Sequence, residues 1–573
     1  MSAFKESVVQ IAELCVRQNV LNFIISPGSR SAPLTLALVR HPNLSCRAIV
    51  DERCAGFVAL GMAQQLERPV GLVCTSGTAV LNYGPSIAEA FYQRIPLLIF
   101  TADRPPEWLD QNDGQTIPQR EIFGKLCRAS FELPLDDPHP DVRWHAGRII
   151  SEAILASLSP AAGPVHINVP LREPLYPNSE LKYNSPARII ASVPQRQILE
   201  DHDWDSLLID WRAAQRRLIV AGMRAPNAKL AEFLRVLQSE RNTAVLFDAT
   251  ANLHDALPLH HSDMILGTEN ESIRGELWPD LLISFGGPVV SKNLKLFLRK
   301  HKPKIHWHLD PAGQCIDTFQ SLTHILPVSA DYFFERLVNS PAFQRRGAGG
   351  GSTDATSGYG EAWIRQEYRV RKDLEHFLKS LPYCEFSAIH AILTRLPKYC
   401  HVQLGNSGII RFVNYLGLSE TNGIRVNSNR GTSGIDGTLS TAVGASLATS
   451  KLTTAIIGDL AFFYDRNALW NSQVPANLRV IVINNYGGGI FRLLDGAGTL
   501  PELGQYFEVE HQLTAERTAA DHGLNYSRCA SLADLEKQLP KFFAPQDRAA
   551  ILEVHTDKQV NTETFLQFKS IMR

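Results

Sequence analysis

Apolar and polar residues follow one repeated order along this chain: a short apolar run, a turn, and then a stretch with helical spacing. In the first third the apolar runs lie in NFIISPG, CRAIVDE, PVGLVCTSG and PLLIFTAD. Short apolar runs that end in turn residues, each followed by a helical stretch, predict buried parallel strands joined by crossover helices. Ligands of such α/β sheets bind at the carboxyl ends of the strands, so polar residues there are the first candidates for a site.

The same order continues through the rest of the chain. The middle third contains RRLIVAGM, NTAVLFDA, DLLISFGG and PKIHWHLD, and the last third contains CHVQLGNSG, IRVNSNRG, TTAIIGDL, RVIVINN and AAILEVHT. Between them, RRGAGGGSTDATSGYG is rich in glycine and serine, which is typical of a flexible linker. A chain of 573 residues is too long for one core. We predict three doubly wound α/β domains with mainly parallel sheets over residues 1–185, 186–345 and 376–573, with a linker and lead-in helix over 346–375.

Composition narrows the class of protein. The chain is 44% hydrophobic and 20% charged, with a net charge of −1, so there is no overall basic field to bind nucleic acid. No apolar run approaches the roughly 18 residues of a membrane span, and the amphipathic start MSAFKESVVQIAELCVRQN carries acids, unlike a signal peptide. The nine cysteines include no CxxC pair, which indicates reduced thiols rather than a zinc site. We therefore expect a cytoplasmic protein with small-molecule partners.

Two polar positions in the last third follow neighbouring apolar runs. Asp459 comes directly after TTAIIG, and Asn485 lies in INNYGGGIF, one strand–helix–strand crossover later. Right-handed crossovers bring the carboxyl ends of both strands to one sheet edge. A carboxylate, an amide oxygen and a glycine carbonyl suit Mg²⁺, which often binds substrate phosphates as well. Either half alone is more simply explained as a turn, but the two at this spacing are more specific.

An acidic residue in the first third completes a family resemblance. Glu52 ends an apolar run in VDERCAGFVALGMA and opens a helix of small residues, where an isolated acid is usually a cap. Taken with Asp459 and Asn485, it resembles the catalytic-glutamate helix and the GDG…NN signature of thiamine-diphosphate enzymes, with Leu460 in place of the last glycine. The resemblance implies that Glu52 contacts the pyrimidine of the cofactor as the catalytic acid. It also implies that Asp459, Asn485 and the Gly487 carbonyl bind Mg²⁺ or Mn²⁺.

Further motifs occur in order from Ser26 onward: SPGSRSAPLTLAL, CTSGTAVLNY, TADRPPEWLD, GNSGIIR, SNRGTSGIDG and NNYGGGIFRLL. They resemble the family of 2-succinyl-5-enolpyruvyl-6-hydroxy-3-cyclohexene-1-carboxylate synthases of menaquinone and phylloquinone biosynthesis. The resemblance implies decarboxylation of 2-oxoglutarate and 1,4-addition of the succinyl semialdehyde–thiamine carbanion to isochorismate. It implies a pyrimidine-binding first domain, a diphosphate-binding third domain, and a homodimer or homotetramer with the cofactor between subunits.

Four arginines agree with anionic substrates. Arg30, Arg104, Arg411 and Arg430 lie in loops or turns beside the motif strands, where a guanidinium can hold a carboxylate with two hydrogen bonds. Each alone could be a surface ion pair, but together they favour dicarboxylates. The resemblance implies cofactor contacts at Gly77, Thr78, Ser407, Ile435, Asp459, Asn485 and Ile490. It implies substrate contacts at Ser29, Arg30, Arg104, Gln115, Lys292, Ser407, Arg411, Arg430, Ile490, Phe491 and Leu494.

Some alternatives stay open at this point. Some relatives have a basic residue after the lysine, where this chain has Asn293, which weakens the assignment of Lys292. Another thiamine-dependent 2-oxoacid decarboxylase, or an acetolactate-type synthase, would share Glu52, Asp459 and Asn485, although the arginines argue against pyruvate as the only donor. A regulatory protein that binds the cofactor without turnover would have little use for Glu52.

Overall fold

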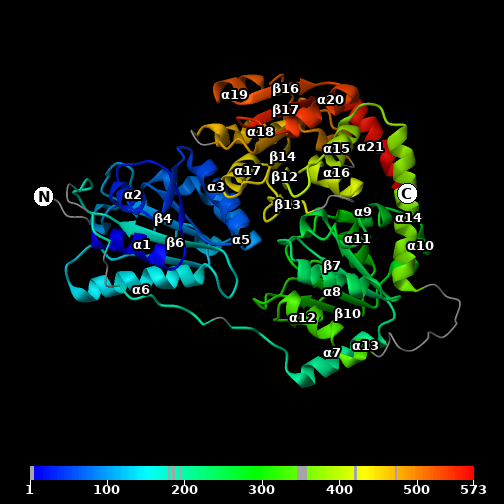
Figure 1. Cartoon of the computed structure of the whole chain (residues 1–573), viewed down its shortest axis with the longest axis horizontal. Helices are drawn as coiled ribbons and strands as arrows, with labels where there is room; N and C mark the ends of the chain where they lie inside the picture. The colour runs from blue at the N-terminus through cyan, green and yellow to red at the C-terminus, as the bar shows by residue number, and fades with distance from the viewer. Residues whose placement is uncertain are drawn as a thin grey trace.

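The computed structural model of the chain describes residues 5–177, 181–183, 187–193, 195–344, 358–418, 423–471, 474–493 and 496–572. It contains three parallel sheets with helices packed around them (Figure 1). The predicted α/β class with parallel sheets is confirmed. Residues 346–357 of the predicted linker and lead-in helix lie outside the described residues, and the predicted domain boundaries stay a prediction.

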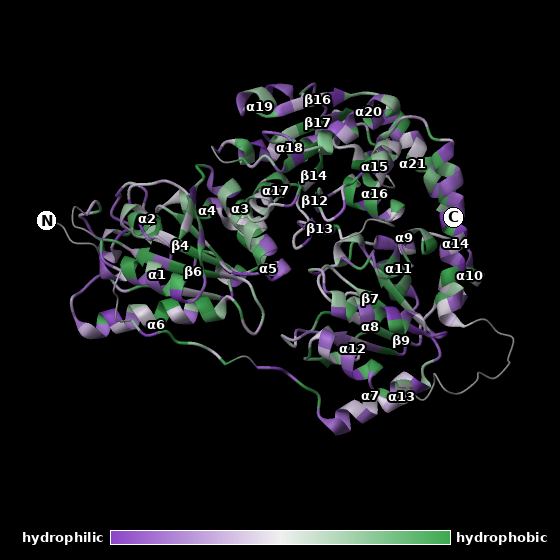
Figure 2. Cartoon of the chain, in the orientation of Figure 1, coloured by the Kyte–Doolittle hydropathy of each residue, from purple (hydrophilic) through white to green (hydrophobic). Residues whose placement is uncertain are grey.

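The first sheet has six strands in the order β2-β1-β3-β4-β6-β5. The strands are β1 Asn22–Ile25, β2 Ser45–Ala48, β3 Val70–Cys74, β4 Leu97–Asp103, β5 Ala129–Glu132 and β6 Pro164–Pro170. The helices are α1 Glu6–Arg17, α2 Ala32–Val39, α3 Glu52–Leu66, α4 Thr78–Asn82, α5 Gly84–Gln93 and α6 Pro140–Ala156. Every residue of β3, β4 and β6 is buried, because helices cover both faces of a parallel sheet. In Figure 2, β4 and β6 accordingly carry much of the green that marks hydrophobic residues.

The middle sheet has five strands in the order β11-β10-β9-β7-β8. The strands are β7 Arg217–Ala221, β8 Thr243–Phe247, β9 Leu281–Phe285, β10 Ile305–Leu309 and β11 His324–Leu326. The helices are α7 Asp201–Ala213, α8 Ala228–Gln238, α9 Ser262–Ile265, α10 Glu271–Leu277, α11 Lys292–Lys300, α12 Ala330–Val338 and α13 Pro341–Gln344. The long helix α14, Tyr359–Lys379, then runs along the outside of the molecule towards the third sheet (Figure 1).

The third sheet repeats the strand order of the first, as β13-β12-β14-β15-β17-β16. The strands are β12 His401–Leu404, β13 Arg425–Ser428, β14 Thr453–Gly458, β15 Leu478–Asn484, β16 Asn525–Cys529 and β17 Ala550–His555. The helices are α15 Glu385–Thr394, α16 Gly408–Leu416, α17 Thr438–Leu447, α18 Asp459–Asp465, α19 Glu516–Asp521, α20 Leu532–Phe543 and α21 Lys558–Met572. Among the described helices, none combines the length and the apolar character needed to cross a membrane.

Helices α3 and α17 join the first and third sheets at very short range. A Cβ atom on Gly61 of α3 would lie 2.0 Å from the Thr441 carbonyl oxygen of α17, and one on Gly444 of α17 would lie 2.0 Å from the Val58 carbonyl oxygen of α3. Only glycine permits backbones to approach this closely. Buried residues of both helices belong to one apolar core. Glu52, the first residue of α3, is therefore held by a helix that packs directly on the third sheet's side of the molecule.

Candidate active site

The carboxylate of Asp459 is the centre of the loops that follow β14 and β15. Asp459 is only 2% exposed, and burial raises its pKa. Its Oδ1 accepts the N–H of Leu460 at 2.6 Å, and its Oδ2 accepts the N–H groups of Gly487 at 3.0 Å and Asn485 at 3.2 Å. The Nε2 atom of His511 lies 3.4 Å from Oδ2. The structure thus brings together Asp459, Asn485 and Gly487, which the sequence placed on two neighbouring strands.

Asn485 presents an oxygen that the protein itself does not use. Its Oδ1 atom is buried and has no hydrogen-bond partner among the described residues. Its side chain hydrogen-bonds to the carboxyl group of Glu385, the first residue of α15. Because the amide nitrogen is the donor in that bond, the oxygen remains free for a ligand. The carboxylate of Asp459 and this orphaned amide oxygen fit a hard divalent cation such as Mg²⁺.

Glu385 is a site residue that the sequence did not reveal. Burial, and then the nearby charge of Asp459, raise the pKa of Glu385 to about 7. Its own backbone N–H donates to Asn561 Oδ1 at 2.8 Å, which fixes the start of α15. An acid at the first position of a helix is so common that it signals only a helix terminus. Only the tertiary structure places this one beside Asn485.

The three glycines after Asn485 allow the chain to fold back on itself. A Cβ atom on Gly487 would lie 2.9 Å from the Glu508 carbonyl oxygen, and one on Gly489 would lie 2.8 Å from Asn485 Nδ2. The N–H of Gly488 donates to the same Glu508 oxygen at 2.7 Å. Side chains at these positions would push the loop away from Asp459. The predicted use of these glycines for close approach therefore has a local structural reason.

The predicted apolar wall follows these glycines in a short 3₁₀ helix, Gly489–Leu493. Ile490 and Phe491 are half-buried there, and the Phe491 ring packs edge-on against Phe507 with the ring centres 5.6 Å apart. Leu494, the third predicted member of the wall, lies outside the described residues. Whether these residues contact substrate stays a prediction.

Two of the four predicted arginines have hydrogen-bond donors to spare. Arg411 of α16 donates to the Ser407 carbonyl, and Arg430 donates to Asn406 Oδ1 at 3.2 Å. The Nε atom of Arg430 is buried without a partner, and neither arginine forms an ion pair in the described part of the chain. Burial, and then the charge of Arg411, lower the pKa of Arg430. These half-buried guanidinium groups near the Asp459 end of the sheet form a cationic surface suited to a carboxylate.

The middle domain adds a second lysine, Lys295, to this surface, and the substrate contact predicted for Lys292 stays a prediction. Lys292 begins α11 and is exposed, whereas Lys295, one turn later, is half-buried. Burial, and then the charge of Arg430, lower the pKa of Lys295. Asn293 donates from Nδ2 to the Asp263 carbonyl at 2.9 Å, so it serves to fix the helix start. The helical spacing of Lys292 and Lys295 was the available signal for the second lysine.

The first domain gathers a second group of predicted residues. Glu52 is half-buried, and burial followed by the adjacent charge of Asp51 raises its pKa. Asp51 caps the helix by accepting the Cys54 N–H at 3.1 Å. Arg30 is buried, donates to the Leu171 carbonyl at 2.9 Å and lies 3.4 Å from Glu173. Ser29, Thr78 and Gln115 are exposed on this side.

Gly77 and Arg104 shape the loop beside Glu52. Gly77 has a φ of +82°, and a Cβ atom there would lie 3.1 Å from the Cα atom of Gln115. Arg104 donates to the Gly114 carbonyl and forms an ion pair with Asp113 at 2.9 Å. Loop 113–115 is thereby held against the turn that leads into α4.

The arginines of the two groups have different charged neighbours within one chain. The charged neighbours of Arg30 are Arg104, Glu173 and Asp113, whereas those of Arg430 are Arg411, Asp248 and Glu89. Ile435, the predicted support of the cofactor, belongs to the third-domain group and is 41% exposed.

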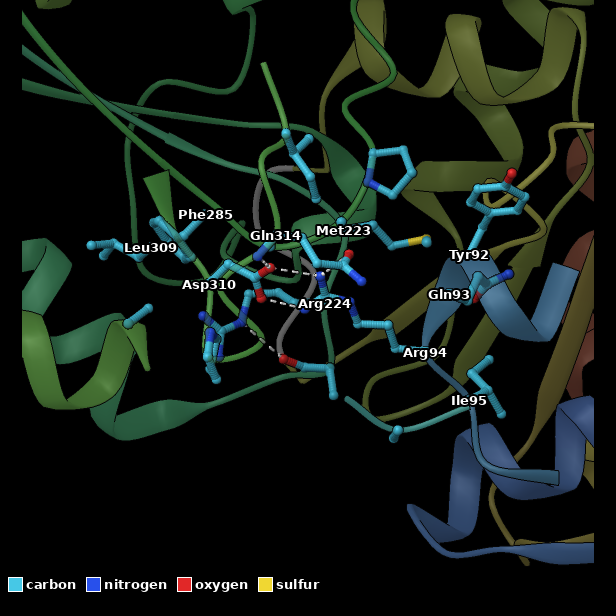
Figure 3. Close-up of a pocket in the computed structure, with 18 of the residues that line it drawn as sticks. Tyr92, Gln93, Arg94, Ile95, Met223, Arg224, Phe285, Leu309, Asp310 and Gln314 are labelled. Carbon is cyan, nitrogen blue, oxygen red and sulfur yellow. Dashed lines mark hydrogen bonds and ion pairs between the residues drawn. The ribbon is translucent and has the colours of Figure 1, made fainter. Parts of the chain in front are cut away.

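A separate cavity of about 860 Å³ lies where residues of all three domains meet. Figure 3 shows the ion pair that crosses it: Arg94, from the end of α5, donates to Asp310 at 2.5 and 2.9 Å and to Gln314 Oε1 at 3.0 Å. Lys295 and Asn427 also line this cavity. The end of α5 is therefore a junction between the first domain and the other two.

Comparison with known proteins identifies the family of the chain. The family model described as the thiamine pyrophosphate enzyme N-terminal TPP binding domain matches residues 8–122, the segment that carries Glu52 and Gly77. A 2-succinyl-5-enolpyruvyl-6-hydroxy-3-cyclohexene-1-carboxylate synthase of Cytophaga hutchinsonii is 40% identical over 570 residues, covering 99% of both chains. Synthases of the same name from Flavobacterium johnsoniae and Desulfotalea psychrophila are 38% and 37% identical, over 97% and 96% of this chain and 97% and 98% of theirs.

These identities extend over nearly the whole chain, so they cover the middle domain as well as the motif-rich outer domains. The resemblance predicted from the sequence motifs is confirmed. The chain belongs to the family of 2-succinyl-5-enolpyruvyl-6-hydroxy-3-cyclohexene-1-carboxylate synthases, which are thiamine-diphosphate-dependent enzymes.

Proposed function

We propose that this protein is a transferase of menaquinone or phylloquinone biosynthesis that acts on 2-oxoglutarate and isochorismate. It decarboxylates the 2-oxo acid and joins the remaining four carbons to isochorismate by 1,4-addition, with thiamine diphosphate and Mg²⁺ or Mn²⁺ bound. The observation that carries the proposal is the orphaned oxygen of Asn485 beside the buried carboxylate of Asp459, with the unpaired donors of Arg430 on the same domain.

The role proposed for each site residue follows from its chemistry. Thiamine diphosphate, when bound, supplies the nucleophilic carbon and accepts the electrons released on decarboxylation. Asp459, Asn485 and the Gly487 carbonyl would hold the divalent cation. Glu52 would hold a proton at N1′ of the aminopyrimidine, and its raised pKa favours the protonated form that such a bond needs. The half-buried side chains of Ile490 and Phe491 would keep water away from the reacting atoms.

The arginines would select the substrates. Arg411 and Arg430 would hold carboxylates from the third domain, and Arg30 and Arg104 would do so from the first, after exchange of their present partners Glu173 and Asp113. A guanidinium remains charged throughout the physiological range and offers paired donors to a carboxylate. Two dicarboxylates therefore fit this cationic site better than pyruvate does.

A homo-oligomer would complete the site. In one chain Arg30 and Arg430 have different charged neighbours, and predicted contact residues of both domains are exposed, among them Ser29, Thr78, Gln115 and Ile435. Two copies arranged with the first domain of one against the third domain of the other would join the halves. We propose a dimer or a dimer of dimers on this basis, located in the cytoplasm.

The decisive experiment is product analysis by mass spectrometry. The protein is incubated with thiamine diphosphate, Mg²⁺, 2-oxoglutarate and isochorismate, and a parallel reaction contains pyruvate in place of 2-oxoglutarate. We expect the coupled product from 2-oxoglutarate only. Equal release of CO₂ from pyruvate would favour an acetolactate-type enzyme, and bound cofactor without turnover would favour a regulatory protein.

Arg411→Ala is expected to raise the KM for 2-oxoglutarate about 10- to 100-fold, because one charged hydrogen-bond pair contributes about 1.5–3 kcal/mol. The dissociation constant of thiamine diphosphate, measured by calorimetry, should change much less. Arg395→Ala, which removes an exposed arginine at the end of α15, is the matched control and should behave as wild type. A loss confined to cofactor binding would contradict the assignment of Arg411 to substrate.

A further inference from the structure

Glu89 is a buried carboxylate of the first domain that accepts hydrogen bonds from a loop of the third domain. It lies on α5 and is 1% exposed. Its Oε1 atom accepts the N–H of Gly431 at 2.6 Å, and its Oε2 atom accepts the N–H and the hydroxyl of Thr432 at 2.7 and 2.6 Å. Gln93, one turn later on α5, donates to Oε1 at 2.5 Å. A carboxylate has about four acceptor positions, and here four donors fill them.

The loop that hydrogen-bonds to Glu89 comprises residues 429–437. It contains Arg430, and we call it the arginine loop. On its opposite side, Asn406 donates from Nδ2 to the carbonyls of Asn429 and Gly434, both at 2.6 Å. Ser433, between these anchors, has a φ of +68°, a conformation that non-glycine residues adopt only when their surroundings impose it. The arginine loop is therefore held in shape by contacts from both domains.

The loop sequence is adapted to this contact. A Cβ atom on Gly431 would lie 2.8 Å from the Glu89 carbonyl oxygen and 3.0 Å from both Glu89 Oε1 and Tyr92 Cβ. Any side chain here would lift the loop away from α5. Gln93 also donates to the Ser428 carbonyl at 3.2 Å, just before the loop. Tyr92, Gln93 and Arg94 follow one another at this end of α5 in Figure 3.

We propose that Glu89 is a positioning residue, which sets the arginine loop so that Arg430 and Ile435 face the active site. Arg430 immediately precedes Gly431, whose N–H donates to Glu89. The unpaired Nε of Arg430 is the donor that a substrate carboxylate would meet. Ile435 lies three residues beyond Thr432 and is fixed through the Gly434 carbonyl. This inference rests on the proposed function, because the purpose of the loop is to present those two side chains.

Glu89→Gln tests the proposal with little change of size. A glutamine side chain has one acceptor oxygen, and its NH₂ group would face a backbone N–H, so at least one of the four bonds is lost. We expect amide hydrogen exchange in segment 429–437 to accelerate at least about tenfold in the protein without cofactor or substrate. We expect the KM for 2-oxoglutarate to rise about tenfold, with a smaller change in kcat.

Two further variants separate positioning from simple loss of stability. Gly431→Ala disturbs the same contact from the loop side and should reproduce both effects. Glu67→Gln removes a different bond between the first and third domains, the ion pair of Glu67 with Arg425 at 3.2 Å, and should leave loop exchange and KM near wild type. Unfolding temperatures are recorded for all three variants.

The outcomes are distinct. Faster loop exchange together with a raised KM in Glu89→Gln and Gly431→Ala, but not in Glu67→Gln, supports the proposal. Unchanged loop exchange in Glu89→Gln, or faster exchange with a wild-type KM, overturns it. A wild-type protein that forms no coupled product would instead overturn the proposed function, and this is established before any variant is measured.

Discussion

Glu52→Gln is expected to slow the release of CO₂ from 2-oxoglutarate about 100- to 10,000-fold, the range that a positioned acid–base group contributes. Glu52 is the first residue of α3, and burial raises its pKa, so its proton is retained to a higher pH than that of an ordinary glutamate. Glutamine has nearly the same size but cannot exchange a proton with the pyrimidine. Single-turnover release of CO₂, at saturating cofactor and metal, measures the chemical step directly.

The neighbouring carboxylate provides a matched control for this prediction. Asp51 caps α3 through the Cys54 N–H, and it accepts a hydrogen bond from Asn467 at 2.9 Å. Asp51→Asn retains the acceptor oxygen of a good helix cap and removes only the smaller, charge-based contribution to the raised pKa of Glu52, so its rate of CO₂ release should stay within a few-fold of wild type. Near-normal turnover in Glu52→Gln, or equal losses in both variants, would remove the catalytic role assigned to Glu52.

The fold was predictable from the sequence wherever a strand is buried on both faces. The strands β3, β4, β9 and β15 consist mostly of apolar residues, and every one of their residues is buried. The strands that the pattern did not reveal, β5, β11 and β16, lie at sheet edges and are largely half-exposed. These three edge strands contain only short or interrupted apolar runs, so periodicity alone could not identify them.

The candidate site likewise contains residues that could be predicted from the sequence and residues that could not. Asp459 and Asn485 could be paired from the sequence because β14 and β15 are adjacent parallel strands, and topology brings their carboxyl ends together. Glu385, Lys295 and Glu89 could not be found in this way, because each comes from a helix that reaches the site only through tertiary packing. On the sequence they look like an ordinary helix start, a surface lysine and a polar helical residue.

Asp459→Asn is expected to weaken the binding of Mg²⁺ or Mn²⁺, in the presence of thiamine diphosphate, by at least about 100-fold. Loss of a residue that merely supports a metal ligand costs 10- to 100-fold, so loss of a charged ligand should cost more. The reason lies in the number of donors around this carboxylate. It accepts the N–H groups of Leu460, Gly487 and Asn485 and still has to offer an oxygen to the cation. An asparagine has one oxygen for both tasks, and its NH₂ group would face either a backbone N–H or the cation.

Asp465, at the other end of the same helix α18, separates metal binding from helix stability. Its carboxylate accepts the N–H and the hydroxyl of Ser440, both at 2.7 Å, and burial raises its pKa to about 6. Asp465→Asn should lower the free energy of unfolding by about 1–3 kcal/mol while calorimetry finds wild-type metal affinity. If Asp459→Asn bound Mn²⁺ as tightly as wild type, the cation would have to be held elsewhere. If both variants lost it equally, the effect would come from disruption of α18 and not from a ligand, since of these two carboxylates it is Asp459 that bonds to Asn485.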